Sequence, residues 1–326
     1  AMTACGAEQE TLAQMENVFG SDLTSLCEYL SAYNDALPSG DKYKLHVANS
    51  VWIKDDEDFK VEPDFLQADT DYFHADIFQC PFDSTTLKDI NSWVSKNTDK
   101  MIPKILDQIP DDAVMYLVNA LAFDARWQSI YRSDQVHDRT FTSFDGTEQD
   151  AELMYSEEHK YLLDSQAQGF LKYYADGKYA FAALLPDEGV SLDDYLASLT
   201  GEQLHQLLVN AEDIKVETAI PKFKQEYSVN LQDILQELGM TDAFDPETAD
   251  FNGICSAPDK QLYINRVLHK TFIEVDEKGT KAGAATAVEM CEFAMISEAK
   301  SVYLDRPFVY MLIDCEELLP VFIGTV

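Results

Sequence analysis

Histidines and cysteines are the residues of this chain best suited to metal binding and nucleophilic catalysis, and their spacing supports neither. None of the six histidines falls in an H-E-x-x-H pattern, and none of the six cysteines belongs to a C-x-x-C pair. Glycine-rich phosphate loops and the G-x-S-x-G nucleophile turn are also missing from the sequence. We therefore expect no catalytic residue, no bound metal, no cofactor and no enzyme activity.

The cysteines show no disulfide framework either, so we expect free thiols that are mostly buried. One of them falls in a segment expected to be exposed, where its thiol would be open to oxidation. The cysteines are Cys5, Cys27, Cys80, Cys255, Cys291 and Cys315, and Cys291 is the exposed one.

A run of small residues at positions 277–286 offers a different kind of chemistry, one made by the backbone. In an extended chain alternate side chains share a face, and here one face carries no charge while Lys281 and Glu289 lie on the other. Because burying an unpaired charge is costly, such a segment suits insertion between existing strands. A flexible linker or a helical stretch is the alternative. The uncharged face consists of Thr280, Ala282, Ala284, Thr286 and Val288.

Two predicted strands flank this run. Residues 271–276 alternate between apolar and polar side chains, and residues 307–314 form a continuous apolar stretch. The connection between them spans about thirty residues, a length that in a compact domain is usually functional or disordered.

With this run of small residues and its flanking strands, the sequence resembles the serpin family, whose reactive-centre loop has this type of hinge. Several motifs in family order carry the resemblance: Leu117-Val118-Asn119-Ala120 leading to Phe123 and Trp127, Pro221-Lys222-Phe223-Lys224, Val267-Leu268-His269-Lys270, Arg306-Pro307-Phe308-Val309, and Phe322-Ile323-Gly324. The resemblance implies an α+β fold with three β-sheets and about eight or nine helices. It also implies one domain over residues 1–326, with a reactive-centre loop at about 277–304.

Elements expected from periodicity agree with an α+β order. Helical spacing predicts helices near residues 12–19, 22–35, 87–94 and 231–239, and alternation or apolar runs predict strands near 46–53, 114–123, 179–185 and 214–220. Residues 1–7 resemble the latter part of a buried family helix. We expect an N-terminal piece, and any targeting signal with it, to be missing from this sequence.

The resemblance also implies roles for individual residues. The hinge would comprise Glu277, Gly279, Thr280, Lys281, Ala282, Gly283, Ala284, Ala285 and Thr286. Asn119 and His269 match the positions called the shutter, where a polar cluster helps control opening of the central sheet, although satisfied polar groups of the core would read the same way. Trp127 matches the breach at the top of that sheet, with an ordinary core tryptophan as the alternative.

The family's mechanism is suicide inhibition of serine proteases, in which the cleaved loop inserts as a central strand and traps the acyl-enzyme. In family spacing the scissile residue lies fourteen after the hinge glycine, and 279 + 14 = 293. This gives Phe293-Ala294 as the reactive bond, with Met295 and Ile296 as alternatives. No basic residue lies between Lys281 and Lys300, so we expect a chymotrypsin-like or elastase-like target.

Composition limits the other partners. The formal charge is 24 − 59 = −35, which would repel phosphate backbones, so we expect no nucleic acid. The candidate helix at residues 22–35 holds no Lys or Arg, so we expect no activation by heparin-like polysaccharides, and no apolar run is long enough for a membrane span. We expect an acidic, secreted monomer.

A non-inhibitory carrier or chaperone serpin remains the alternative function, because Lys281 and Gly283 depart from the family pattern. An unrelated enzyme or adhesion domain is the third hypothesis.

Overall fold

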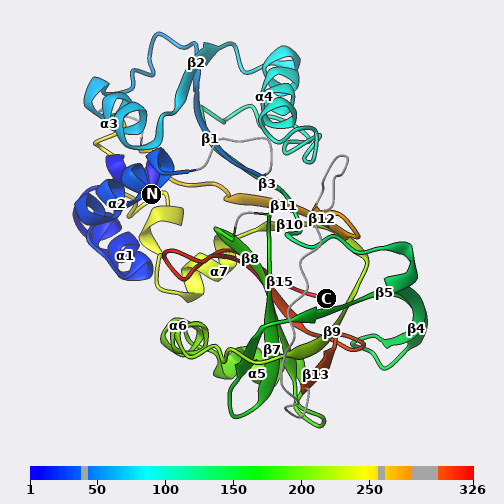
Figure 1. The fold of residues 1–326 in the computed structure, drawn as a ribbon. Helices are drawn as coiled ribbons and strands as arrows, with labels where there is room; N and C mark the ends of the chain where they lie inside the picture. The colour runs from blue at the N-terminus through cyan, green and yellow to red at the C-terminus, as the bar shows by residue number, and fades with distance from the viewer. Residues whose placement is uncertain (38–42, 176, 256–260, 281–299) are drawn as a thin grey trace. The chain divides into compact units, whose positions relative to one another are not determined.

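The computed structural model describes residues 1–37, 43–175, 177–255, 261–280 and 300–326. Its α-helices are α1 (Gln9–Phe19), α2 (Leu23–Asp35), α3 (Pro63–Phe73), α4 (Ser84–Asn97), α5 (Leu192–Ser198), α6 (Gly201–Val209) and α7 (Gln232–Glu237) (Figure 1). Three short 3-10 helices are η1 (Met2–Gly6), η2 (Ser133–Gln135) and η3 (Asp242–Phe244). The four helices predicted from periodicity are therefore present as α1, α2, α4 and α7.

The strands of the described residues belong to a six-stranded sheet of order β10-β11-β12-β3-β1-β2, a four-stranded sheet of order β13-β9-β5-β4, and a five-stranded sheet of order β15-β14-β8-β7-β6. Their bounds are β1 (Tyr43–Lys54), β2 (Asp76–Cys80), β3 (Met115–Arg126), β4 (Val136–Thr142), β5 (Glu148–Glu158), β6 (Lys160–Leu163), β7 (Ala167–Tyr173), β8 (Tyr179–Pro186), β9 (Val216–Pro221), β10 (Phe223–Asn230), β11 (Leu268–Asp276), β12 (Gly279–Thr280), β13 (Lys300–Tyr303), β14 (Val309–Asp314) and β15 (Leu319–Thr325).

The inventory implied by the resemblance was wrong in detail. The described residues form seven α-helices rather than eight or nine, and isolated bridge pairs add strand pairing outside the three sheets just named. Both ends of the expected loop at 277–304 also lie in strands, since Gly279–Thr280 forms β12 and Lys300–Tyr303 forms β13.

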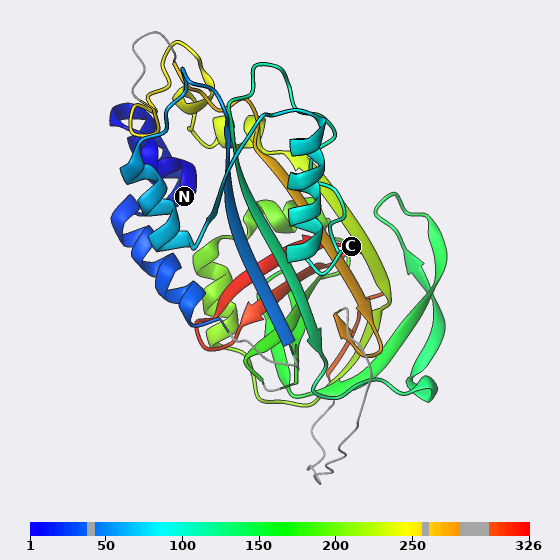
Figure 2. The same ribbon diagram turned by 90° about the horizontal axis from the view of Figure 1, so that it is seen from above.

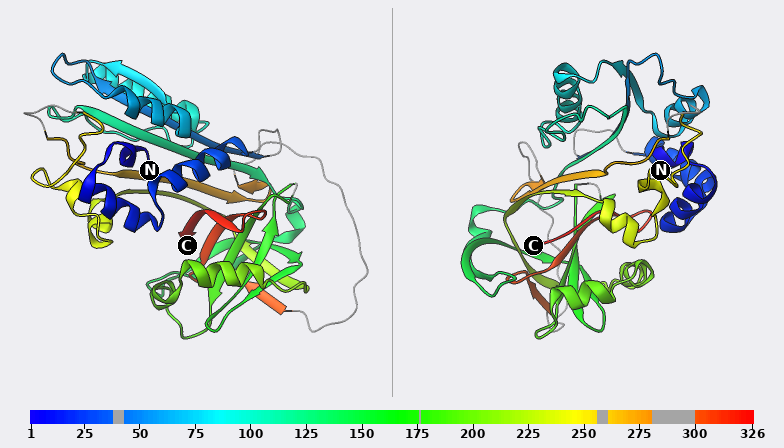
Figure 3. Two further views of the ribbon diagram at one scale, coloured as in Figure 1. Left: turned by 90° about the vertical axis from the view of Figure 1, so that its left-hand side faces the viewer. Right: turned by 180° about the vertical axis from the view of Figure 1, so that it is seen from behind.

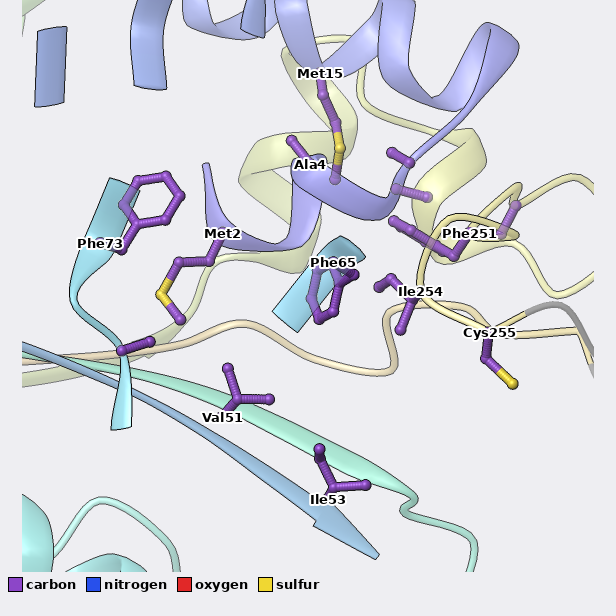
Figure 4. Close-up of a cluster of buried hydrophobic side chains, with 14 of the residues drawn as sticks. Met2, Ala4, Met15, Val51, Ile53, Phe65, Phe73, Phe251, Ile254 and Cys255 are labelled. Atoms are coloured by element: carbon purple, nitrogen blue, oxygen red, sulfur yellow. The ribbon is translucent and has the colours of Figure 1, made fainter. Parts of the chain in front are cut away.

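The chain divides into two compact units, and strands β3, β10 and β11 run from one into the other. Unit 1 comprises residues 1–39, 44–122 and 226–272. Within it β1 is buried on both faces, because alternate side chains point to opposite sides. Val51 and Ile53 join the core of η1, α1, α2 and α3 (Figure 4). Trp52, whose side chain points the other way, packs with Ile90 and Val94 of α4. Figures 2 and 3 show helix α4 lying along this part of the sheet.

Unit 2 comprises residues 40–43, 123–225 and 273–326. Its centre is β8, in which every residue is buried. The strand pairs with β7 on one side and β14 on the other, and helices α5 and α6 pack on this five-stranded sheet through leucines. A strand covered on both faces and both edges reads as a continuous apolar run, which is why the sequence predicted it.

Candidate functional site

A hairpin with a two-residue turn forms the start of the predicted hinge in unit 2. Strand β11 ends at Asp276, the chain turns through Glu277 and Lys278, and β12 pairs back so that Val275 faces Thr280. The carboxylate of Asp276 accepts hydrogen bonds from the backbone N–H groups of Lys278 (2.7 Å) and of the following glycine (3.2 Å). We call residues 275–280 the hinge hairpin. It is an ordered turn, and it directs the chain back along β11.

Gly279 permits the other edge of β12 to approach β3. It lies opposite Arg126, and a Cβ atom at this position would lie 2.1 Å from the carbonyl oxygen of Ala125. Any larger residue would therefore push β12 off β3. With glycine in place, Thr280 pairs with Ala125, so β12 lies between β3 and β11 (Figure 1).

Thr280 points into the protein. Its side chain is 2% exposed, and its hydroxyl lies 2.6 Å from the phenol oxygen of Tyr174, which is fully buried. Burial raises the pKa of Tyr174, so its phenol stays protonated. The face assigned to Thr280 from alternation is thus the buried one in the structure.

Trp127 holds the hinge hairpin from the β3 side. Its indole Nε1 donates a hydrogen bond to the carbonyl of Asp276 (2.9 Å), and its backbone N–H donates to the carbonyl of Lys278 (2.9 Å). The ring is 2% exposed and stacks on Tyr174 with ring centroids 4.6 Å apart. A third backbone bond runs from the N–H of Tyr131 to the carbonyl of Glu277 (2.9 Å).

An ion pair fixes the turn of the hinge hairpin from outside. The ammonium of Lys222 lies 2.5 Å from a carboxylate oxygen of Glu277 and 3.0 Å from one of Glu152. The hydrogen bond to Glu277 contributes most to raising the pKa of Lys222. Burial opposes the charge of Glu277, but Lys222 outweighs it and lowers the pKa of that carboxyl.

A buried charge network that the sequence reasoning missed lies next to Trp127. The ammonium of Lys172 donates to Glu158 at 2.7 Å and to the hydroxyl of Ser156 at 3.4 Å, and it lies 4.3 Å from the ring centroid of Tyr131. Burial works against the charged amine, but Tyr131 and Glu158 outweigh it and raise the pKa of Lys172. The available signal was a lysine that directly follows the apolar residues Phe170 and Leu171 in β7.

In unit 1 the structure does not bring the two predicted shutter residues together. Asn119 donates through its amide to Asn49 at 2.8 Å, and Asn49, which is 6% exposed, donates to the carbonyl of Phe73 at 2.7 Å. His269 is exposed, and partial desolvation lowers its pKa. Among the described hydrogen bonds none joins Asn119 to His269, so the polar cluster here is Asn49 with Asn119.

A cavity of about 590 Å³ lies in unit 1 and is lined by β3 and by the segment that leads into β11. One wall is residues 115–119 of β3, and the facing wall is residues 261–268, which lead into β11. Ile105 and Leu106 from the segment after α4 also line it. In the part of the chain that the structure describes, only the two-residue β12 pairs between β3 and β11.

The rest of the predicted site lies outside the described residues. This applies to hinge residues Lys281, Ala282, Gly283, Ala284, Ala285 and Thr286, and to the reactive-bond candidates Phe293, Ala294, Met295 and Ile296. Among the described residues, no group of three or more His, Cys, Asp or Glu side chains is placed to hold a metal ion. In that same part of the chain, no helix combines the length and apolar character needed to cross a membrane.

Comparison with known sequences and structures identifies the class of protein to which this fold belongs. The chain matches the family described as serpin (serine protease inhibitor) over residues 1–326. It therefore belongs to the serpin family.

Individual relatives support this assignment. The crystal structure of tengpin, a thermophilic serpin, in the native state has 47% sequence identity and a TM-score of 0.93, with 100% of this chain and 84% of that chain covered. A serpin-like protein of Methanosarcina acetivorans is 30% identical over 339 residues, with 100% of this chain and 78% of the relative covered. The leukocyte elastase inhibitor of Bos taurus is 30% identical over 331 residues, with 96% and 85% covered.

Proposed function

We propose that this serpin is a suicide-substrate inhibitor of serine proteases that traps the acyl-enzyme by inserting its cleaved loop as a central strand. One observation carries the proposal. The first two residues of that strand, Gly279 and Thr280, are already paired between β3 and β11. Cleavage further along the loop would free the following residues to continue from them.

The register of the hinge hairpin predicts where an inserted strand would lie. Antiparallel partners on β3 sum to 405 (279 + 126 and 280 + 125), so residues 280–290 would face residues 125–115, which is the whole of β3 from Ala125 back to its first residue, Met115. Partners on β11 sum to 555 (280 + 275), so residue 287 would face Leu268, the first residue of β11. The small uncharged face therefore matches both strands in length.

The same arithmetic gives the separated shutter residues a common partner. Thr286 would face Asn119 on β3, since 405 − 286 = 119, and His269 on β11, since 555 − 286 = 269. Directly opposed residues share a face of the sheet. A hydroxyl at this position could bond to both an amide and an imidazole, which supports insertion as the state that unites them.

Insertion would supply enough free energy to distort a tethered protease. About a dozen new ladder hydrogen bonds at roughly 0.5–1.5 kcal/mol each give on the order of ten kcal/mol. From the hinge glycine to the scissile residue the strand would span fourteen residues, or about 46 Å at about 3.3 Å per residue.

For the target we propose a chymotrypsin-like or elastase-like protease that cleaves Phe293-Ala294, with Met295 and Ile296 as alternative sites. A large apolar residue suits the deep pocket of a chymotrypsin-like enzyme, and a small one suits an elastase-like pocket. The name of the bovine relative, leukocyte elastase inhibitor, supports this class. We further propose that the protein acts as an extracellular monomer.

The test is incubation with chymotrypsin and with pancreatic elastase, followed by denaturing electrophoresis and by mass spectrometry of the released fragment. We expect a covalent complex that survives denaturation, and cleavage at the proposed bond. Thr280→Arg places a charge on the buried face and should turn the protein into a substrate that is cleaved without forming the complex. Lys281→Arg, on the outward face, should keep inhibition. A Thr280→Arg variant that still inhibits would falsify strand insertion.

A non-inhibitory carrier or chaperone is the second candidate, because Lys281 and Gly283 differ from the residues typical of inhibitory members. It predicts cleavage of the loop by both proteases with no trapped species and no rise in the unfolding temperature of the cleaved protein. The same experiment therefore separates the two functions.

A further inference from the structure

Two cysteines from separate elements of unit 1 have their sulfur atoms in contact. Cys5 lies on η1 and Cys27 on α2, and their Sγ atoms are 3.8 Å apart. Of the three other described cysteines, Cys80 and Cys315 contact backbone carbonyls through their sulfurs, and Cys255 is buried in the hydrophobic core of unit 1. Among the thiols that the structure describes, the pair of Cys5 and Cys27 is thus the one placed for a bond between two sulfurs.

The two members of the pair differ in access. Cys27 is 2% exposed and is the buried residue by which α2 docks on the core, whereas Cys5 is partly exposed. A small reagent from solution can therefore reach the sulfur of Cys5 before it reaches that of Cys27. This is the arrangement of an attacking thiol and a resolving thiol.

The surroundings keep both sulfurs protonated at rest. Burial raises the pKa of Cys5 and of Cys27, and the carboxylate of Asp69 on α3 adds to both effects. Because the thiolate is the reactive form, the pair should resist casual oxidation and react slowly with a mild disulfide.

We propose that Cys5 and Cys27 form an oxidative modification site that closes to an intramolecular disulfide on reaction with a low-molecular-weight disulfide. The Cys5 thiolate attacks one sulfur of the reagent, forms a mixed disulfide and releases one small thiolate. The Cys27 thiolate then attacks the sulfur of Cys5 and releases the second. The protein loses two electrons and two protons, and the reagent gains them as two free thiols.

The bond would tie α2 to η1. Closing the sulfurs from 3.8 Å to about 2.05 Å requires only a small approach of the two elements. The link encloses a loop of about twenty residues, which stabilises the folded state mainly by restricting the unfolded chain. We therefore expect the midpoint of thermal unfolding to rise by several degrees after oxidation.

The chain offers a simple readout. The first Lys or Arg is Lys42, so trypsin releases Cys5 and Cys27 on one peptide, and closure lowers its mass by two hydrogens. A second cut after Glu16 separates the two cysteines, and only a disulfide then keeps the halves together. The full chain is treated with 2-hydroxyethyl disulfide and then with a thiol-alkylating reagent before digestion.

We expect the linked peptide in the wild type and in Cys80→Ser, and its loss in Cys5→Ser and in Cys27→Ser. We also expect oxidised wild type to unfold several degrees above reduced wild type, a comparison that needs no variant to fold. Alkylation of both thiols after treatment, or a mixed disulfide that stays on Cys5, would overturn the proposal. So would equal unfolding temperatures of the linked and reduced proteins.

Discussion

The phenol oxygen of Tyr174 and the hydroxyl oxygen of Thr280 lie 2.6 Å apart, although 106 positions separate them in the sequence. Both groups are buried, so neither has water as an alternative partner. The first residue on the buried face of the predicted insertion strand is thus held by the side chain of the residue that follows β7. This bond joins the hinge hairpin to the rest of unit 2.

Replacing Tyr174 by Phe should loosen the hinge hairpin. The change leaves the hydroxyl of Thr280 buried without its partner, at a cost of about 1–3 kcal/mol. Hydrogen exchange at the amides of β12 should become roughly ten-fold faster or more, since about 1.4 kcal/mol corresponds to that factor. Tyr161→Phe, which removes a phenol bonded to Gln168, is the matched control and should leave these amides unchanged. Equal exchange at β12 in both variants would contradict the role given to Tyr174.

Removing the buried ammonium of Lys172 should destabilise unit 2 far more than removing the ammonium of Lys160, which pairs with an exposed acid. Lys172→Met leaves Glu158 charged and unpaired, which costs about 3–5 kcal/mol. Lys160→Met breaks a pair whose acid, Asp213, is 81% exposed, and should cost about 0–1 kcal/mol.

The measurement is urea denaturation followed by tryptophan fluorescence, since Trp127 lies beside the network. The double change Lys172→Met with Glu158→Met should recover much of the loss, because it removes both buried charges. Similar urea midpoints for Lys172→Met and Lys160→Met would show that the buried ion pair contributes no more to stability than the partly exposed one.

The elements were predictable from the sequence where their signals are local. Leu87, Ile90 and Val94 share one face of α4, and Gly239 ends the helical spacing of α7, so periodicity and a terminating glycine sufficed. The Glu277–Lys222 pair was not predicted, because the chain is acidic throughout and any carboxylate could have been the partner.

Other parts of the site depend on which state the central sheet occupies. The residue types at positions 119 and 269 could suggest a shared polar cluster. The local sequence of the two strands, however, does not determine whether the strands are neighbours in the sheet. The structure instead shows Asn49 as the partner of Asn119. The expected reactive bond at Phe293 stays a prediction, since it falls outside the described residues.

Replacing Asp69 by Asn should remove a pH dependence of stability. Burial raises the pKa of this carboxyl to about 7, and neither of its oxygens has a hydrogen-bond partner among the described residues. A carboxyl whose folded pKa lies above its unfolded value stabilises the fold below about pH 4, and that contribution is lost as the pH rises through about 7. The loss is on the order of 4 kcal/mol.

We therefore expect the unfolding temperatures of Asp69→Asn and wild type to diverge between pH 4 and pH 8, with the variant higher at pH 8. Thermal unfolding across this range is the measurement. Asp64→Asn, at an exposed site on the same helix, should follow the wild type. A wild type and Asp69→Asn difference that does not change with pH would rule out this titration.

Thr286→Val should lower the stability of the cleaved protein but not that of the uncleaved protein. In the register proposed for insertion, the hydroxyl of Thr286 faces Asn119 and His269, and valine would leave these groups without it, at about 1–3 kcal/mol. The unfolding temperature of the protease-cleaved form should fall, and Thr286→Ser should restore it. An unchanged temperature for cleaved Thr286→Val would place the inserted strand in another register.

The turn at Glu277 and Lys278 has a kinetic consequence. The expensive event in adding a strand is bringing distant chain ends together, because the entropy of closing that loop is lost before any ladder bond forms. Here the closure is complete in the uncut molecule. In the proposed mechanism, a cleaved loop would only have to add residues 281–293 to the sheet one at a time, starting from Thr280. The rate of that addition would decide whether the protease is trapped before water hydrolyses the ester of the acyl-enzyme.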